Sequence, residues 1–185
     1  MSSYNTGNNL VDSNFLLEKA GVHEGMHIAD FGCGRTGHMV FSAAKIVGEK
    51  GIIYAVDILK DVLESVRRRA LTETFHNIET IWGDIATPHG VSISDKSLDA
   101  VFLVNVLFHF ENYEEILFES ARLLKSKGRI VIADWQNHLE GIGPMEEKMI
   151  DFDKIISWTI QNNFSVQEDM NIGNYHRALL LYRNV

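Results

Sequence analysis

Three acidic residues stand where apolar runs of the sequence end, and a glycine-rich turn follows the first of them. Asp30 lies two residues before the first glycine of segment 28–37 (IADFGCGRTG), Asp57 ends a second apolar run, and Asp84 follows a third. Glycines let the backbone turn sharply and let a ligand approach the main chain closely. Ionised carboxylates accept hydrogen bonds from hydroxyl, amino and ammonium groups. This pattern predicts a site for a nucleotide-like cofactor.

The spacing of the glycines is compatible with two classes of cofactor. Gly32, Gly34 and Gly37, with Asp57 about 20 residues further on, fit the fingerprint of a dinucleotide-binding turn. Asp30, however, stands where its charge would repel a pyrophosphate and attract an ammonium group. The residues therefore favour a cofactor that carries a cationic group, and a nicotinamide dinucleotide is the alternative.

Apolar runs alternate with segments of helical period, which is typical of a parallel sheet flanked by helices. The runs predict strands at about 26–31, 51–57, 78–82, 98–104 and 128–134, and helices near 37–48, 59–72 and 112–125. A further helix at about 151–162 precedes two β-like runs, 164–169 and 176–183, which the short connection through Gly173 joins as an antiparallel hairpin. Since parallel strands end at one edge of a sheet, the three carboxylates are expected to meet there.

The N-terminal segment is expected to lie over this site. Asp12 or Ser13 can cap a short helix that ends at Gly21. We expect residues 1–21 to form a helical cap over the cofactor and residues 1–185 to form a single domain.

Several short motifs follow one another in a fixed order along the chain. They are Asp30-Phe-Gly-Cys-Gly, Tyr54-Ala-Val-Asp57, Gly83-Asp84-Ile85, segment 98–102 with Asn105, and segment 123–128. In these motifs the chain resembles the class I S-adenosylmethionine-dependent methyltransferases, and in particular small archaeal and bacterial enzymes similar to ubiquinone/menaquinone-biosynthesis methyltransferases. The resemblance implies an α/β fold with a Rossmann-like, seven-stranded, mostly parallel sheet, helices on both faces and a C-terminal antiparallel hairpin. One departure is Thr36, which stands where the family has glycine, so that the glycine comes one residue later.

The resemblance also implies S-adenosylmethionine as the cofactor and a role for each matching residue. Asp57 is expected to bind the ribose hydroxyls, Asp84 the adenine amino group, and Asp30 with Asn105 the methionine end. The remaining expected cofactor residues are Phe31, Gly32, Cys33, Gly34, Gly37, Ile58 and Ile85. The alternatives are that Asp57 and Asp84 only cap the helices that follow them, and that Asp30 only orients the glycine turn.

Methyl transfer needs a general base only when the acceptor must lose a proton. The candidates are His109, His138 and His176, which follow or begin strands whose ends the resemblance places at one edge. We expect the three to share one pocket with Trp135 and Tyr175. One alternative is that the three are polar or packing histidines without a catalytic role. Another is a three-histidine metal site, although we predict that the protein holds no metal.

Composition narrows the class of acceptor. The chain has 17 Lys and Arg against 25 Asp and Glu, a net charge of −8, which opposes binding to nucleic acid. The only cysteine, Cys33, has no evident basic partner to activate it and fits a reducing compartment. The sequence has no apolar run of membrane-spanning length, so we predict a cytoplasmic protein. The predicted function is that of a methyltransferase for a small molecule. The alternatives are an NAD-dependent oxidoreductase and a non-catalytic S-adenosylmethionine-binding protein.

Overall fold

The structure is a computed structural model that describes residues 10–185, and it alternates strands with helices as the sequence predicts. The helices are α1 (Ser13–Lys19), α2 (His38–Val47), α3 (Lys60–Thr72), α4 (Glu114–Leu123) and α5 (Phe152–Gln161). The strands are β1 (His27–Phe31), β2 (Ile52–Asp57), β3 (Ile78–Trp82), β4 (Leu98–Val104), β5 (Leu124–Trp135), β6 (Phe164–Ile172) and β7 (His176–Arg183). The short 3-10 turns η2 (Leu107–His109) and η3 (Glu146–Lys148) lie in loops.

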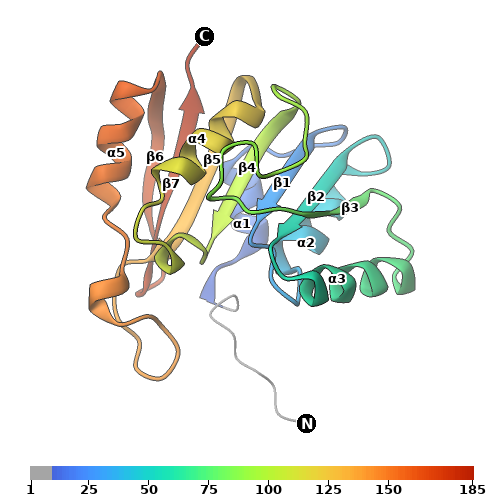
Figure 1. The fold of residues 1–185 in the computed structure, drawn as a ribbon, viewed down its shortest axis with the longest axis horizontal. Coiled ribbons are helices and arrows are strands. Elements are labelled where there is room, and N and C mark those ends of the chain that lie inside the picture. The colour runs from blue at the N-terminus through green and yellow to red at the C-terminus, as the bar shows by residue number, and fades with distance from the viewer. Residues whose placement is uncertain (1–9) are drawn as a thin grey trace.

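The seven strands form one sheet in the order β3-β2-β1-β4-β5-β7-β6 (Figure 1). Strands β1 to β5 run parallel to one another, whereas β7 is antiparallel to both β5 and β6. The predicted Rossmann-like sheet with its C-terminal antiparallel hairpin is therefore confirmed. The order reverses between β1 and β4, and such a switch point is where open α/β sheets bind ligands.

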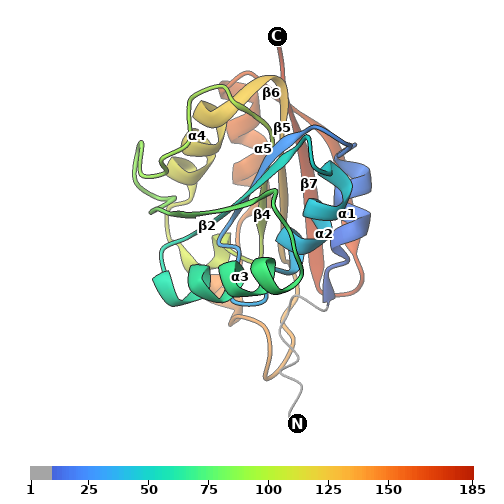
Figure 2. The same ribbon diagram turned by 90° about the vertical axis from the view of Figure 1, so that its right-hand side faces the viewer.

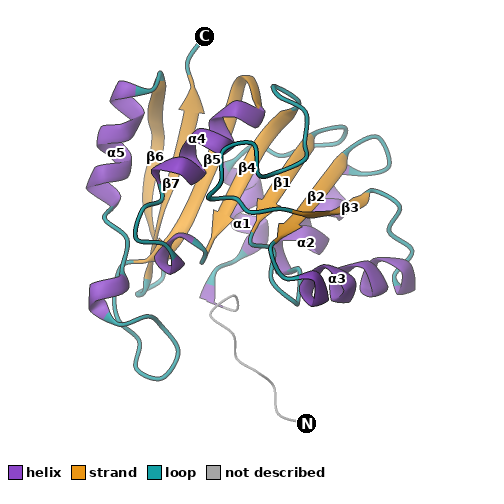
Figure 3. Ribbon diagram, in the orientation of Figure 1, coloured by secondary structure: helices purple, strands orange, loops and turns teal. Residues whose placement is uncertain are grey.

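Each face of the sheet is covered by helices, which makes three layers (Figures 2 and 3). Buried side chains of α1, α2 and α3 share one apolar cluster with β1, β2 and β4, while α4 and α5 contribute to a second cluster on the other face. Among residues 10–185, no helix is long and apolar enough to cross a membrane.

Short-range signals in the sequence set several helix ends. The Asp12 carboxylate accepts hydrogen bonds from the N–H groups of Asn14 and Phe15, at 2.9 and 3.3 Å, and so caps α1. After α5, Asn163 has a φ of 61°, the left-handed conformation that commonly follows a helix.

The boundary between α4 and β5 differs from the prediction. The helix expected to reach residue 125 ends at Leu123, and the strand expected from 128 begins at Leu124. Leu124 already pairs with Leu98, and the ladder then resumes with Arg129 opposite Ala100. Segment 125–128 leaves the ladder between these pairs, so the apolar pattern alone places the start of the strand too late.

Candidate functional site

The glycine turn after β1 folds over the end of β2. The N–H groups of Gly32 and Cys33 donate to the carbonyl of Val56 at 2.9 and 3.1 Å. Gly32 has a φ of 73°, and a Cβ added to it would lie 2.5 Å from Cγ2 of Val106. Only glycine therefore fits between this turn and the loop after β4.

The displaced glycine of the turn begins α2. Gly37 has a φ of 56°, and an added Cβ would lie 2.9 Å from the ring of Phe41. Next to it, Nη1 of Arg69 donates to the Thr36 carbonyl at 2.8 Å, and the guanidinium lies 3.8 Å above the Phe41 ring. No local signal in the sequence predicts this role of Arg69, because its bond to Thr36 joins separate elements.

A cavity of about 480 Å³ lies at the carboxyl ends of the strands, within the usual size range of ligand sites. Its lining includes the predicted cofactor residues Gly32, Gly34, Asp57, Ile58, Asp84, Ile85 and Asn105, and also His109. We call it the cofactor cavity. Convergence of these residues from four loops is the main structural observation about the site.

Asp57 joins the glycine turn to the segment before α3. Its Oδ2 accepts from the Gly34 N–H at 3.2 Å, and its Oδ1 accepts from the Leu59 N–H at 3.0 Å. The N-cap residue of α3 is Leu59, and no side chain caps this helix. A carboxylate has about four acceptor positions, so Asp57 retains capacity for a ligand diol. Beside it, the side chain of Ile58 is 54% exposed and offers an apolar surface.

Asp84 stabilises its own turn at the edge of the same cavity. Its Oδ1 accepts from the Ala86 N–H and its Oδ2 from the Thr87 hydroxyl, both at 2.9 Å. Among the described residues between β3 and β4 there is no helix, so these bonds stabilise a turn and do not cap a helix, and Asp84 lines the cavity. The buried side chain of Ile85 anchors the neighbouring backbone in the core.

A second, much smaller cavity of about 20 Å³ has Asp30 among its lining residues. It shares Gly32 and Val104 with the cofactor cavity, and Val11 and Ser13 close it from the N-terminal side. Burial, and then the charge of Asp57, raise the pKa of the Asp30 carboxyl to about 7. A ligand ammonium group would offset the cost of ionising this buried carboxyl.

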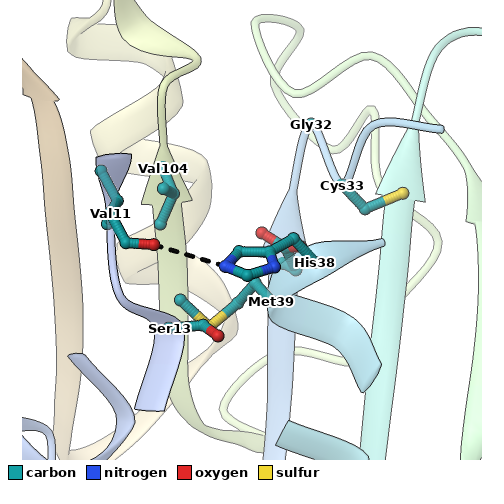
Figure 4. Close-up of a pocket in the computed structure, with 8 residues that line it drawn as sticks. Val11, Ser13, Gly32, Cys33, His38, Met39 and Val104 are labelled. Carbon is teal, nitrogen blue, oxygen red and sulfur yellow. Dashed lines mark hydrogen bonds between the residues drawn. The ribbon is translucent and has the colours of Figure 1, made fainter. Parts of the chain in front are cut away.

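The predicted N-terminal cap is described only in part, because residues 1–9 lie outside the described residues. From residue 10 onward, α1 packs against α2. The hydroxyls of Ser13 and Ser42 lie 2.8 Å apart. Nε2 of His38 donates to the Val11 carbonyl at 3.3 Å (Figure 4). This contact places the start of α1 beside Asp30.

Three of the predicted cofactor residues shape the turn from outside the cofactor cavity. Phe31 is fully buried in the core, and Gly37 begins α2. The Cys33 side chain borders the smaller cavity but points away from His38 (Figure 4). Burial and the charges of Asp30 and Asp57 raise the pKa of the Cys33 thiol, which keeps it protonated and a poor nucleophile.

The three candidate histidines do not share one pocket. His109, carried by η2, lines the cofactor cavity. His138 is exposed, and its Nδ1 donates to the Pro144 carbonyl at 2.9 Å. His176 is fully buried, with its ring 4.3 Å from that of Trp135. Within residues 10–185, no group of three His, Cys, Asp or Glu side chains could hold a metal ion.

His176 contacts Asn105 at the edge of the site. Its Nε2 donates to Oδ1 of Asn105 at 2.8 Å, and Asn105 has a φ of 52° where it lines the cofactor cavity. Burial lowers the pKa of His176 to about 4, so the ring is neutral, and its Nδ1 has no hydrogen-bond partner. This geometry suits a residue that positions Asn105 better than a base that meets an acceptor.

Two buried acids that the sequence did not single out hold the loops of the site. Asp134, at the end of β5, accepts from the N–H groups of Leu107 and Trp135 at 2.9 and 2.8 Å, and so fixes η2. Burial raises its pKa to about 7. Asp134 ends an apolar run of the sequence as Asp57 does, and this is the signal that could have identified it.

Glu119 of α4 fixes the loop that follows Asp84. Its carboxylate accepts from the N–H groups of His89 and Val91, both at 3.1 Å, and pairs with the guanidinium of Arg122. In the sequence, this acid and Arg122 resemble an ordinary pair on a helix surface, so the buried role was not predictable.

The fold and the site define a class of protein, the class I S-adenosylmethionine-dependent methyltransferases. A solved S-adenosylmethionine-dependent methyltransferase from Aquifex aeolicus superimposes with a TM-score of 0.83 at 21% identity, covering 95% of this chain and 92% of that one. A putative type 11 methyltransferase from Sulfolobus solfataricus has a TM-score of 0.70 at 26% identity, with 93% and 91% coverage.

The chain belongs to the methyltransferase domain family, which matches residues 22–176. The family predicted from the sequence motifs is thereby confirmed. A probable cobalt-precorrin-6B C(15)-methyltransferase (decarboxylating) of Sulfurisphaera tokodaii is 34% identical over 116 residues, covering 63% of this chain and 57% of that protein. The ubiquinone/menaquinone biosynthesis C-methyltransferase of Blochmanniella floridana is 26% identical, with 65% and 46% coverage. The chain thus spans about half the length of these relatives.

Proposed function

We propose that the protein binds S-adenosylmethionine in the cofactor cavity and transfers its methyl group to a small-molecule acceptor. The observation that carries the proposal is the convergence of the glycine turn, Asp57 and Asp84 on one cavity of about 480 Å³. Membership of the methyltransferase domain family supports it. The names of two relatives refer to a precorrin and to quinone biosynthesis, which supports a small molecule as the acceptor.

The residues of the cavity fit the parts of this cofactor. Asp57 retains acceptor capacity for the ribose hydroxyls, and the exposed side chain of Ile58 offers a surface for the adenine ring. Asp84 and the backbone of Ile85 lie further along the same wall, where we assign the adenine edge. The buried carboxyl of Asp30 suits the ammonium group of the methionine end.

The cofactor, when bound, supplies an already activated methyl group. The protein then has to align the reactants and keep water away. Gly32 lets the loop after β4 approach the turn, and Asp134 fixes η2 in that same loop. These contacts hold the loops in a defined geometry before an acceptor enters.

The net charge of −8 and the predicted cytoplasmic location complete the proposal, with nucleic acid disfavoured as an acceptor. A nicotinamide-dependent oxidoreductase is the alternative class of enzyme. Asp30 argues against it, because its carboxylate would face the pyrophosphate of a dinucleotide. A protein that binds the cofactor without transferring a methyl group is the second alternative.

Isothermal titration with S-adenosylmethionine, S-adenosylhomocysteine and NADH tests the proposal. We expect micromolar binding of the first two ligands and none of NADH. Binding of NADH alone would show that the protein is an oxidoreductase. Binding of S-adenosylmethionine with no methyl transfer to a broad acceptor panel would support the non-catalytic alternative.

A further inference from the structure

A second cavity of about 420 Å³ adjoins the cofactor cavity, and the two share His109 and Phe110. We call it the adjoining cavity. Much of its wall is aromatic or aliphatic, formed by Phe108, Phe110, Tyr113, Met149 and Ile150. The hydroxyl of Tyr113 donates to the Asp151 carbonyl at 2.9 Å and is therefore already used. The aromatic residues suit the flat apolar face of a molecule that also carries a polar group, because the rest of the lining is polar or charged.

The charged residues of the adjoining cavity are of both signs. They are Lys148, Lys154, Glu111, Glu147 and Asp151. The Asp151 carboxylate accepts from the N–H groups at the start of α5 and serves as its cap. Because the acids outnumber the lysines, a molecule with a permanent negative charge gains little from entering. A neutral molecule is favoured.

His109 stands at the junction of the two cavities, with its ring centroid 3.9 Å from that of Phe108. Partial burial, and then the positive charge of Lys148, lower the pKa of His109. The imidazole is therefore unprotonated at neutral pH and can accept a proton. The same lysine would stabilise a negative oxygen that forms beside the ring.

We propose that the adjoining cavity binds a flat, uncharged acceptor with a weakly acidic hydroxyl, a phenol or an enol, and that His109 accepts the hydroxyl proton. This proposal rests on the proposed function. The O–H bond breaks, the proton goes to a ring nitrogen of His109, and the oxygen forms a bond to the methyl carbon. The carbon–sulfur bond breaks with its electron pair remaining on sulfur, so the products are a methyl ether, S-adenosylhomocysteine and a proton that His109 returns to solvent.

Binding of 4-nitrophenol tests the proposal without turnover, because its phenolate absorbs visible light and the neutral phenol does not. We expect saturable binding to the full chain, with and without S-adenosylhomocysteine, and a phenolate signal at a pH where the free compound is protonated. His109→Gln should lower this signal at least fivefold while 4-nitroanisole, which has no acidic proton, binds as before. Lys148→Met should lower the signal less. The matched controls, His138→Gln and Lys45→Met, change a histidine and a lysine outside the cavity and should leave it unchanged.

Charge selectivity is tested with 4-nitrobenzoate, which we expect to bind at least tenfold more weakly than 4-nitrophenol. No saturable binding of 4-nitrophenol, preferential binding of the benzoate, or an unchanged phenolate signal in a folded His109→Gln variant would each overturn the proposal. Titration of the same preparation with S-adenosylmethionine separates the two levels of inference. Cofactor binding without phenol binding contradicts only the acceptor class, whereas absence of cofactor binding contradicts the proposed function.

Discussion

Asp57 is the single residue on which the placement of the cofactor depends most. We expect Asp57→Ala to weaken S-adenosylmethionine binding by about 1–3 kcal/mol, because charge-assisted hydrogen bonds to the ribose are lost. Isothermal titration measures the change. Asp169→Ala is a suitable control, since Asp169 pairs with Arg177 on the hairpin, away from the cavity. An unchanged affinity in folded Asp57→Ala would show that the ribose lies elsewhere.

Asp30 gives cofactor binding a pH dependence with a definite sign. Its pKa of about 7 in the free protein means that the carboxyl is mostly protonated at pH 6 and mostly ionised at pH 8. A ligand ammonium group favours the ionised form, so we expect the affinity for S-adenosylhomocysteine to rise about tenfold between these values. Asp30→Asn should bind weakly and lose this dependence. Titrations at a series of pH values measure it, and an affinity that falls as pH rises would contradict the assignment.

The same shift affects the stability of the cofactor-free protein. Burial raises the pKa of Asp30 above its ordinary value of 3.8. The protonated carboxyl therefore stabilises the folded protein, and this contribution is fully present below pH 3.8. It is lost as the pH rises through about 7. At pH 4 we expect the free energies of unfolding of Asp30→Asn and of the unchanged protein to be close. At pH 8 they should differ more, with the variant the more stable of the two. Urea unfolding at the two pH values checks both the direction and the window.

His176 is expected to act through Asn105 and not as a base. His176→Gln retains an N–H donor and should keep most of the cofactor affinity, whereas His176→Leu should weaken binding about tenfold, the usual effect of one lost hydrogen bond and an unsatisfied partner. Both substitutions should leave the ionisation of bound 4-nitrophenol unchanged. If His176 were the base, the Gln variant would bind normally and lose that ionisation.

At the scale of elements, the site depends on how closely the glycine turn approaches the loop after β4. Gly32→Ala would place a Cβ 2.5 Å from Val106 at a positive φ, so the two loops must separate. We expect this variant to bind S-adenosylmethionine at least tenfold more weakly. The control is Gly25→Ala, which also has a positive φ, 85°, but meets nothing within 4 Å. It should lose about 1 kcal/mol of stability without a change in affinity, and equal losses of affinity in both would contradict this account of the turn.

The order of the elements was predictable because each strand has its own apolar run and each helix its own period. The hairpin was also predictable from the turn at Gly173, since its signal is local. The end of α4 was not predictable, because Leu124 joins the sheet through a long-range pairing with Leu98.

Long-range contacts explain what the sequence did not reveal about the site. Asp57, Asp84 and Asn105 end strands of one parallel sheet, so their convergence follows from the topology. The positions of His138 and His176 depend instead on a loop contact to Pro144 and on burial beside Trp135. Neither contact has a local signature in the sequence.

At the scale of the whole molecule, different parts of the fold line the two cavities. The ends of β1, β2, β3 and β4 and the loops after them line the cofactor cavity, while the segment between β4 and α4, the loop after β5 and the start of α5 line the adjoining cavity. His109 and Phe110 belong to both cavities. Under the two proposals, the cofactor and the acceptor would meet at the boundary that these residues form.

A crystal structure of the complex with S-adenosylhomocysteine tests the central claim most directly. We expect the ribose within hydrogen-bonding distance of Asp57, the adenine ring against Ile58, and the amino group beside Asp30. The homocysteine sulfur should then face His109 across the boundary of the two cavities. A ligand bound elsewhere, or bound here with its ribose away from Asp57, would contradict the account.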